Sequence, residues 1–251
     1  MRILVAGATG YVGSRLVPVL LAAGHEVRVG VRRADLAARM PWAGGAEVVP
    51  LEVRERSQAR AALAGMDALC YLVHGLAGDD FAGEDRIAAE TMATEAVGAD
   101  LSRIVYLSGL VPDVGAADLS PHIASRLEVE QILTASGIAT LSVRAGMILG
   151  GGSTSFEVLR QVSERFVLQP VPSWLGSRVQ PIAVTDVLLA LAGALRTSGV
   201  APTSRSYDVG GPDVLTYPAL LRLYAASARL WRFQVRVPLV PSRVVGVAGG
   251  W

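Results

Sequence analysis

The sequence predicts an α/β fold with a doubly wound parallel sheet, and three observations predict it. Short β-branched apolar runs alternate with longer amphipathic segments, which is the β-α-β order of a parallel sheet. Several runs are apolar throughout, as expected of strands that helices cover on both faces. A glycine-rich segment directly follows the first run. With 251 residues and 51% apolar residues, the chain can fill one core of ordinary size.

The elements of the first 150 residues follow in order along the chain. Helix-like segments separate the apolar runs, so each pair of strands is joined by a crossover. We expect strands at residues 2–6, 27–31, 47–49, 68–73, 103–107 and 140–144. We expect helices at residues 12–23, 57–64, 84–97 and 122–136.

The first expected strand runs into Gly7-Ala8-Thr9-Gly10-Tyr11-Val12-Gly13, which opens the first helix. Gly7 permits a tight turn, Gly10 lets the backbone approach a pyrophosphate, and Gly13 allows close packing of helix and strand. The N-terminus of the helix favours the negative charge. A structural turn is the alternative, but the strand-before, helix-after context indicates a Rossmann-type dinucleotide site. Its expected residues are Gly7, Thr9, Gly10, Tyr11, Val12 and Gly13.

The end of the second strand discriminates between cofactors. A chain that uses NAD normally has an acid there to hold the ribose 2′-hydroxyl. This chain has Arg32 and Arg33 instead, and two guanidinium groups suit a 2′-phosphate. The alternative is a pair of solvated surface arginines. The sequence therefore favours NADP(H) as the cofactor.

Two further strand ends are expected to contact the dinucleotide. Glu52 and Val53 follow the third strand, where an acid–apolar pair often borders the adenine. Leu72, Val73 and His74 follow the fourth strand, at the carboxyl edge where the nicotinamide ribose would lie. His74 is expected to contact either the ribose or the substrate.

The composition excludes several classes of protein. The net charge is +1 with no dense basic run, so nucleic-acid binding is not expected. All 23 basic residues are Arg, which excludes a P-loop lysine, a Schiff base and a Tyr-Lys catalytic pair. The three histidines show no ligand spacing, so no metal site is expected. No Gly-x-Ser-x-Gly elbow occurs, which argues against a hydrolase.

The number of cysteines and the hydropathy of the chain indicate the cellular compartment in which it is expected. The single Cys70 excludes an internal disulfide, so a reducing cytoplasm is expected. The N-terminal apolar run passes straight into glycines and is expected to be a strand rather than a signal peptide. No uninterrupted apolar stretch reaches about 18 residues, so no membrane span is expected.

The pattern of expected helices, strands and loops changes after Gly150. We expect a flexible link at residues 150–155, a helix at 156–167, and a Pro- and Trp-containing loop at 169–177. Later helices at 185–196 and 217–229 flank a strand at 206–209, and residues 242–250 form an apolar stretch before Trp251. Residues 1–150 are expected to be the dinucleotide-binding core. Residues 151–251 are expected to form a small substrate cap, together with remaining core elements of one integrated domain.

These residues resemble the short-chain dehydrogenase/reductase superfamily. Gly-x-x-Gly-x-x-Gly with Ala8-Thr9 is similar to its extended and atypical branches, the NmrA-like NAD(P)H-binding proteins. The run Tyr71-Leu72-Val73-His74 is similar to a Tyr-Leu-Val-His run of bacterial atypical members. Similarity continues through Arg144-Ala145-Gly146-Met147-Ile148-Leu149-Gly150 and Pro181-Ile182-Ala183, so it spans nearly the whole chain. On this resemblance, Arg144 and Ala145 are expected at the cofactor.

The chain departs from the superfamily at the catalytic residues. The superfamily has Tyr-x-x-x-Lys on the helix after the fifth strand, and the matching helix here carries His122 and Arg126. His122 is a candidate general acid, or simply the start of a helix. Arg126 is a candidate fixed cation at the ribose or the substrate oxygen, because Arg keeps its proton. Ser108 is a candidate donor to a carbonyl oxygen, or a turn hydroxyl.

Two functions remain open at this point. The first is an NADPH-dependent ketone reductase, and the resemblance includes ketoreductases that tailor aromatic polyketides of the angucyclinone type, enzymes of antibiotic biosynthesis. A phenol-bearing aromatic ketone would carry its own proton source, and an apolar lid over it is expected from Phe156 and Trp174. These aromatics could equally fill a core. The alternative function is a non-enzymatic NADP(H) sensor with a protein partner. The oligomeric state is open.

Overall fold

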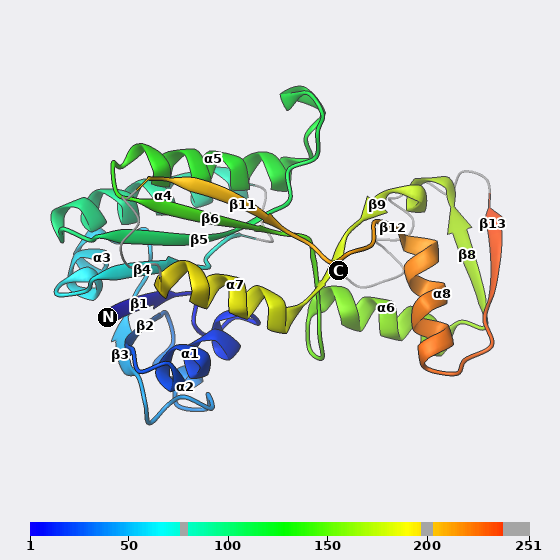
Figure 1. Ribbon diagram of the computed structural model, residues 1–251, viewed down its shortest axis with the longest axis horizontal. Helices are drawn as coiled ribbons and strands as arrows, with labels where there is room; N and C mark the ends of the chain where they lie inside the picture. The colour runs from blue at the N-terminus through cyan, green and yellow to red at the C-terminus, as the bar shows by residue number, and fades with distance from the viewer. Residues whose placement is uncertain (76–79, 197–202, 238–251) are drawn as a thin grey trace. The chain divides into compact units, whose positions relative to one another are not determined.

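The computed structural model describes residues 1–75, 80–196 and 203–237 (Figure 1). The chain forms two compact units. The first unit comprises Met1–Ala145 and Val184–Val209, and the second comprises Gly146–Ala183 and Gly210–Trp251. The second unit therefore begins after a core of 145 residues, and the chain returns to the first unit for one helix and one strand.

The first unit contains a seven-stranded sheet in the order β11-β6-β5-β4-β1-β2-β3, and all its neighbouring strands are parallel. The predicted α/β fold with a Rossmann-type parallel sheet is confirmed. Strand order reverses beside β1, so β1 and β4 lie in the middle of the sheet. The strands are β1 (Arg2–Ala6), β2 (Glu26–Val31), β3 (Glu47–Pro50), β4 (Ala68–Tyr71), β5 (Arg103–Gly109), β6 (Thr140–Ala145) and β11 (Arg205–Val209).

Helices cover both faces of this sheet. In Figure 1, α3, α4 and α5 lie on one face, and α1, α2 and α7 lie on the other. The pairs α3–α4 and α4–α5 pack together on the first face, and α1 packs against α7 on the second. The helices are α1 (Gly13–Ala22), α2 (Ala34–Ala37), α3 (Arg56–Leu63), α4 (Phe81–Gly98), α5 (Pro121–Ala135) and α7 (Val184–Arg196), with a 3₁₀ turn at Ala116–Asp118.

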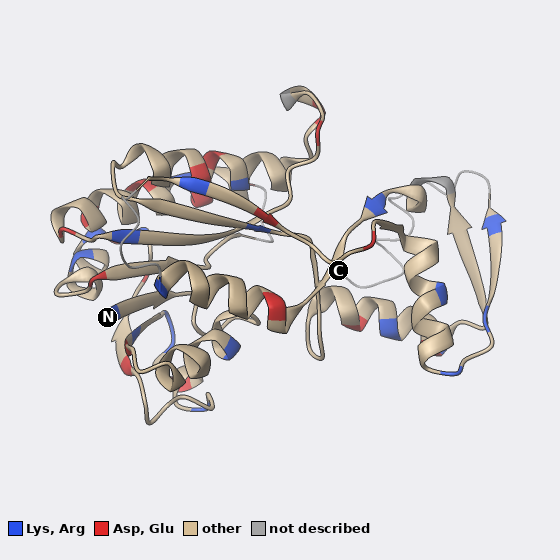
Figure 2. Ribbon diagram, viewed as in Figure 1, with Lys and Arg blue, Asp and Glu red and all other residues tan. Residues whose placement is uncertain are grey.

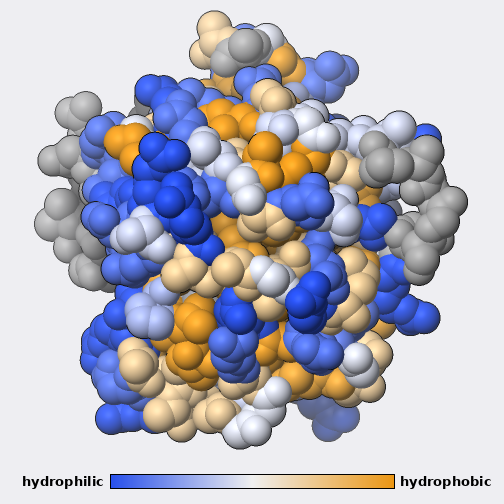
Figure 3. Space-filling model, turned by 90° about the vertical axis from the view of Figure 1, so that its left-hand side faces the viewer, coloured by the Kyte–Doolittle hydropathy of each residue, from blue (hydrophilic) through white to orange (hydrophobic). Residues whose placement is uncertain are grey.

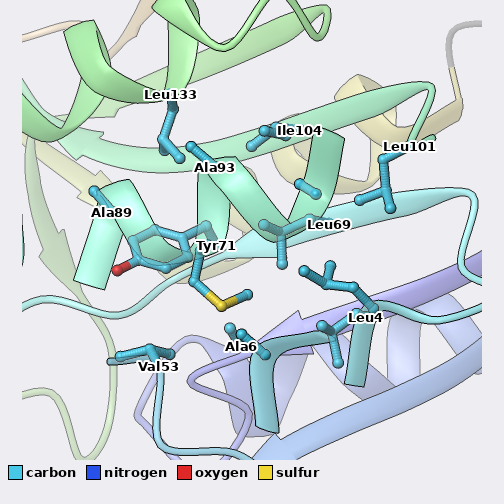
Figure 4. Packing of buried hydrophobic residues seen from close by; sticks show 14 of the residues in the cluster. Leu4, Ala6, Val53, Leu69, Tyr71, Ala89, Ala93, Leu101, Ile104 and Leu133 are labelled. Atoms are coloured by element: carbon cyan, nitrogen blue, oxygen red, sulfur yellow. The ribbon is translucent and has the colours of Figure 1, made fainter. Parts of the chain in front are cut away.

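The core beneath α3, α4 and α5 forms from alternate residues of the central strands. Leu4 and Ala6 of β1 and Leu69 and Tyr71 of β4 point to this face, since successive strand residues alternate in direction. Small residues of α4 such as Ala89 let the helix approach the sheet closely, and Figure 4 shows this packing. The phenol rings of Tyr71 and Tyr106 lie with their centroids 5.9 Å apart at the carboxyl end of the core.

The second unit is smaller and is built around two helices. Helices α6 (Thr154–Arg165) and α8 (Tyr217–Ser227) pack together, and their buried residues are Leu159, Leu220 and Leu221. Three two-stranded sheets accompany them: β7 (Met147–Leu149) with β10 (Pro181–Ala183), β9 (Arg178–Val179) with β12 (Leu215–Thr216), and β8 (Leu168–Pro172) with β13 (Phe233–Val237).

The structure corrects two predictions in the second unit. The expected loop at 169–177 is largely regular: β8 occupies its first part, and a 3₁₀ turn at Ser173–Gly176 follows. Two prolines in β8 are tolerated because β13 is its one partner strand in the described chain. The expected link at 150–155 is shorter, because Ser153 caps α6 by accepting a hydrogen bond from the Phe156 N–H at 3.2 Å.

Cys70 lies fully inside β4, and its burial raises the pKa of the thiol to about 12. Across the described ranges, no helix has the length and apolar character needed to cross a bilayer. The described His, Cys, Asp and Glu residues form no group of three that could hold a metal ion. Residues 242–251 lie outside the described chain.

Polar and apolar residues share the surface. Figure 2 shows charged residues on the helices of both units, and Figure 3 shows hydrophilic and hydrophobic residues interspersed over one face.

Candidate cofactor and catalytic site

The glycine loop after β1 has the backbone geometry that only glycine supplies. Gly7 has φ +90°, and a Cβ there would lie 3.1 Å from the carbonyl carbon of Leu72. A Cβ at Gly13 would lie 2.2 Å from the carbonyl oxygen of Gly7, so a side chain at this position would push α1 away from the loop. The N–H of Gly10 donates to the same carbonyl at 3.1 Å and closes the turn. All three glycines therefore hold the loop tight against α1.

The start of α1 supplies no capping side chain or acid of its own. The N-cap residue is Val12, which has no side-chain hydrogen bond to the helix, and the first turn contains no acid. The guanidinium carbon of Arg15 lies 4.1 Å from the centroid of the Tyr11 ring, and this side chain also donates to the Tyr11 carbonyl at 3.0 Å. A glycine cradle beside an uncapped helix terminus and a cation fits a dinucleotide diphosphate.

Arg32 and Arg33 follow β2 and are both exposed. Arg33 makes a bidentate pair with Asp35, at 2.6 Å and 3.2 Å, which raises the pKa of Arg33 and lowers that of Asp35. Arg32 has no carboxylate partner among the residues that the structure describes. Of the two predicted phosphate ligands, only Arg33 therefore has a carboxylate partner within the described residues. The role of both at a 2′-phosphate stays a prediction.

The two residues after β3 have different environments. Val53 belongs to the buried core cluster. The backbone N–H of Glu52 donates to Gln58 Oε1 at 2.8 Å, and its carboxylate accepts from Arg54 at 3.2 Å. These contacts fix the end of β3, and an adenine contact by Glu52 and Val53 stays a prediction.

His74 lies just beyond the carboxyl end of β4, after the buried Leu72 and the partly buried Val73. Burial is the largest cause that lowers the pKa of His74 to about 4; Arg126 lowers it further, and Asp85 opposes this. Its Nδ1 is buried and has no hydrogen-bond partner within the described chain. His74 is therefore an uncharged imidazole at neutral pH with a ring nitrogen available to a ligand.

The end of β5 places a hydroxyl and a cation close together. Ser108 is buried on the same face of the sheet as Tyr106, two residues earlier, and its hydroxyl lies beside that phenol. The next residue, Gly109, leaves room for Arg126: a Cβ at Gly109 would lie 2.9 Å from Arg126 Nη1. The Tyr106 hydroxyl donates to the Arg126 carbonyl at 3.4 Å.

His122 lies in the first turn of α5 and is exposed. Ser120 caps this helix, since its hydroxyl accepts from the Ile123 N–H at 3.4 Å. The His122 ring stacks on Phe81, the first residue of α4, and also acts on the pKa of His74. The structure therefore brings His74, Ser108, His122 and Arg126 together at the carboxyl ends of β4 and β5.

The sequence reasoning did not identify Asp85, a buried acid of α4 beside this group. Its carboxylate accepts from the Gly75 N–H at 2.6 Å and from the Ser125 hydroxyl at 3.1 Å. A signal was present in the sequence: Asp85 precedes Ala88 and Ala89 by three and four residues, so it lies on their buried face of α4. Ser125 is likewise buried and was not singled out.

Arg144 is held by an internal ion pair. Its guanidinium donates to both carboxylate oxygens of Glu130 on α5, at 2.6 Å and 3.0 Å, and this pairing raises the pKa of Arg144. Glu130 also accepts from the Ser206 hydroxyl of β11 at 2.6 Å. The network ties α5 to the sheet edge. A cofactor contact by Arg144, or by the buried Ala145, stays a prediction.

The aromatic residues predicted at the substrate belong to the second unit. Phe156 is partly buried and packs edge-on against Tyr224 of α8, with ring centroids 5.8 Å apart. This contact gives Phe156 a packing role within its own unit. The side chain of Trp174 lies outside the described part of the chain, and the substrate role of both residues stays a prediction.

A family model described as NAD(P)H-binding matches residues 7–191, which cover the glycine loop, β4, β5 and α5. The chain belongs to this NAD(P)H-binding family. Membership confirms a nicotinamide dinucleotide as the class of cofactor, and the preference for NADP(H) stays a prediction.

Relatives of this NAD(P)H-binding chain are longer proteins. It is 26% identical to the mitochondrial NADH dehydrogenase [ubiquinone] 1 alpha subcomplex subunit 9 of Arabidopsis thaliana, over 93% of this chain and 60% of that protein. It is 27% identical to an uncharacterised protein of Mycobacterium tuberculosis, over 96% of this chain and 24% of that protein. The chain thus spans less than two thirds of the length of these relatives.

Solved structures share the fold of this NAD(P)H-binding chain. A double mutant of DesIV, the dTDP-glucose 4,6-dehydratase of Streptomyces venezuelae, solved with NAD bound, has a TM-score of 0.76 and 22% identity. The likeness covers 95% of this chain and 84% of that one. At this identity the comparison concerns the fold alone.

Proposed function

We propose that this chain is an NADPH-dependent oxidoreductase that reduces a ketone carbonyl, with a planar aromatic compound as substrate. The observation that carries the proposal is the polar group His74, Ser108, His122 and Arg126, which gathers at the same sheet edge as the glycine loop after β1. In open parallel sheets, ligands bind at the carboxyl ends of the strands beside the point where strand order reverses. When bound, the dinucleotide would supply a hydride from its reduced nicotinamide ring.

The chain's own residues would hold the dinucleotide at two places. The loop from Gly7 to Gly13 and the uncapped start of α1 would bind the diphosphate. Arg32, whose guanidinium has no carboxylate partner in the described chain, would bind a 2′-phosphate, with Arg33 contributing when it releases Asp35. The preference for NADPH over NADH rests on these two arginines.

We assign different roles to the two histidines of this site, His74 and His122. His74 is uncharged at neutral pH because its pKa is about 4, so it can hydrogen-bond a ligand but has no proton to give as an acid. His122 is exposed on the first turn of α5, and imidazole is the side chain most often used for general acid catalysis. We therefore assign proton donation to the substrate oxygen to His122.

Arg126 and Ser108 would act on the same oxygen electrostatically. Arg126 remains a cation throughout, so it stabilises negative charge that develops on a carbonyl oxygen. The Ser108 hydroxyl lies at the end of the neighbouring β5 and is suited to donate a hydrogen bond there. This division of work replaces the Tyr-Lys pair that a chain without lysine cannot form.

The aromatic substrate class rests on two supports. The Phe81 ring stacks on the ring of His122, the proposed donor, so aromatic rings lie at the proposed site. The resemblance to NmrA-like proteins includes ketoreductases of aromatic polyketides of the angucyclinone type. A ketone that neighbours its own phenol would also require less acid catalysis from the protein.

Consumption of NADPH with a panel of polyaromatic ketones and quinones, followed by absorbance, tests this proposal. We expect turnover with at least one member of the panel and none with simple sugars. Tight NADPH binding without turnover across the panel would contradict it. Arg126→Met is the matched variant, because it keeps an unbranched stem at this position and removes the cation.

The alternative function is an NADP(H)-sensing protein without turnover. The absence of lysine from the chain and the subunit role stated in the name of the Arabidopsis relative favour it. This function requires a protein partner whose binding depends on the redox state of the cofactor. Affinity capture with the oxidised and the reduced cofactor, each with the wild-type chain, would reveal such a partner as a difference between the two samples.

A further inference from the structure

Asp85 occupies a position where two segments of the proposed site meet. It lies in the second turn of α4 and is 7% exposed. One carboxylate oxygen, Oδ1, accepts from the backbone N–H of Gly75, which follows β4. The other, Oδ2, accepts from the hydroxyl of Ser125 on α5. Each oxygen therefore holds a different segment of the chain.

A buried carboxylate is costly unless its surroundings compensate for the charge. Asp85 has no salt bridge among the residues that the structure describes, and its two hydrogen-bond donors are neutral. An apolar residue of similar volume would serve the packing of α4 better. The buried carboxylate is therefore the feature that needs an explanation, and its two hydrogen bonds show which segments it joins.

The two donors to Asp85 stand beside the proposed catalytic residues in the sequence. Gly75 follows His74, and Ser125 precedes Arg126 on the same turn of α5 as His122. Phe81 also connects the two segments. A Cβ at Gly75 would lie 3.2 Å from the Cβ of Phe81, and the Phe81 ring stacks on His122. One carboxylate thus connects the segment of His74 with the helix that carries His122 and Arg126.

We propose that Asp85 is a positioning residue of this site, which fixes the segment of His74 and Gly75 against the first turns of α5. This inference rests on the proposed function, since the segments it fixes are those that carry the reductase chemistry. Asp85 acts through Gly75 and Ser125 and does not itself touch the reacting atoms. Charge-assisted hydrogen bonds are short and directional, which suits them to this task.

Steady-state kinetics of four variants tests the proposal. Asp85→Asn keeps the size of the side chain and removes the charge, and Ser125→Ala removes one donor. A misplacement of about 1 Å can cost roughly 100-fold in rate, so we expect kcat to fall about 10- to 100-fold in Asp85→Asn and less in Ser125→Ala. We expect the affinity for NADPH to stay within about 2-fold, because the glycine loop is untouched. Ser125→Thr keeps the hydroxyl and is expected to retain more kcat than Ser125→Ala.

Glu84→Gln is the matched control. Glu84 precedes Asp85 on α4 and is exposed, with an ion pair to Arg54 at 2.9 Å. Its loss removes one negative charge from the same turn without touching the site, so kcat is expected to be unchanged. A kcat for Asp85→Asn equal to that of Glu84→Gln, with the fold retained, would overturn the positioning role.

A spectroscopic measurement tests the positioning role of Asp85 independently of reductase activity. The chain has three histidines, so the side-chain ¹⁵N signals of His25, His74 and His122 can each be assigned by substitution. In Asp85→Asn we expect the signals of His74 and His122 to shift, the Gly75 amide to exchange faster, and His25 to stay unchanged. Absence of turnover in the wild type would contradict the proposed reductase function. Unchanged His74 and His122 signals in Asp85→Asn would contradict the positioning role of Asp85.

Discussion

The imidazole of His122 stacks on the ring of Phe81, with ring centroids 4.6 Å apart and ring planes inclined by 23°. The contact joins the first residue of α4 to the first turn of α5 and holds an exposed imidazole at the carboxyl edge of the sheet. It explains how a side chain at a helix start can have a defined orientation without a buried hydrogen bond.

The variant His122→Phe tests the proposed proton donation by His122 separately from the stacking of this side chain on Phe81. The substituted ring can still pack on Phe81, so the fold and NADPH affinity are expected to persist. Turnover is expected to fall about 100-fold, which is the usual contribution of a general acid. The measurement is kcat with the best ketone of the panel. A fall of less than about 3-fold would show that the substrate or the solvent donates the proton.

Arg32→Glu is expected to weaken NADPH binding by about 10- to 100-fold, because it removes charge-assisted hydrogen bonds and adds a repelling charge. NADH binding is expected to change little. Arg33→Glu is the matched variant, and its effect is expected to be smaller because Asp35 already occupies that guanidinium at 2.6 Å. Titration calorimetry with both cofactors measures these changes. Equal losses for NADPH and NADH in Arg32→Glu would refute the 2′-phosphate assignment.

Gly13→Ala is expected to abolish tight dinucleotide binding. The added Cβ would meet the Gly7 carbonyl oxygen at 2.2 Å, so α1 and the loop must separate, at a cost of about 1–3 kcal/mol in unfolding free energy. Gly98→Ala, where no atom lies within 4 Å of the added Cβ, is the control. Thermal melting and cofactor titration of both variants are the measurements. Undiminished binding in Gly13→Ala would exclude the loop as the diphosphate site.

The lowered pKa of His74 predicts how the free energy of unfolding depends on pH. Its pKa is lowered from 6.5 to about 4 by burial, so between these values the unfolded chain binds a proton that the folded chain does not. The free energy of unfolding is therefore expected to fall as pH decreases from about 6.5 to 4, by on the order of 3 kcal/mol from this group. His74→Gln should flatten that part of the profile in urea titrations. An identical profile for the variant would contradict the burial of an uncharged His74.

The central sheet was predictable from the sequence because its determinants are local. The apolar run of β1 ends where the glycines begin, and the structure places that strand at Arg2–Ala6. Strand β8 was missed because its pairing depends on β13, which lies more than 60 residues later, and because two prolines made the segment resemble a loop. The short strands of the second unit gave no periodicity to detect.

The candidate site was predictable only in part. Residues that directly follow an expected strand, such as His74 and Ser108, could be assigned to the carboxyl edge of the sheet from topology alone. Asp85 was missed, since an acid in a helix is normally solvated and its spacing to Ala88 and Ala89 was the one signal of its burial. The pairing of Arg144 with Glu130 was hidden because the two residues meet only when α5 lies on β6.

Titration calorimetry of the purified wild-type chain with NADPH and with NADH is the decisive measurement of cofactor binding. We expect each cofactor to bind with a stoichiometry of one, and NADPH to bind at least about tenfold more tightly, because a phosphate contact adds a charge-assisted interaction worth about 1.5–3 kcal/mol. Absence of binding by both cofactors, or tighter binding of NADH, would contradict this expectation.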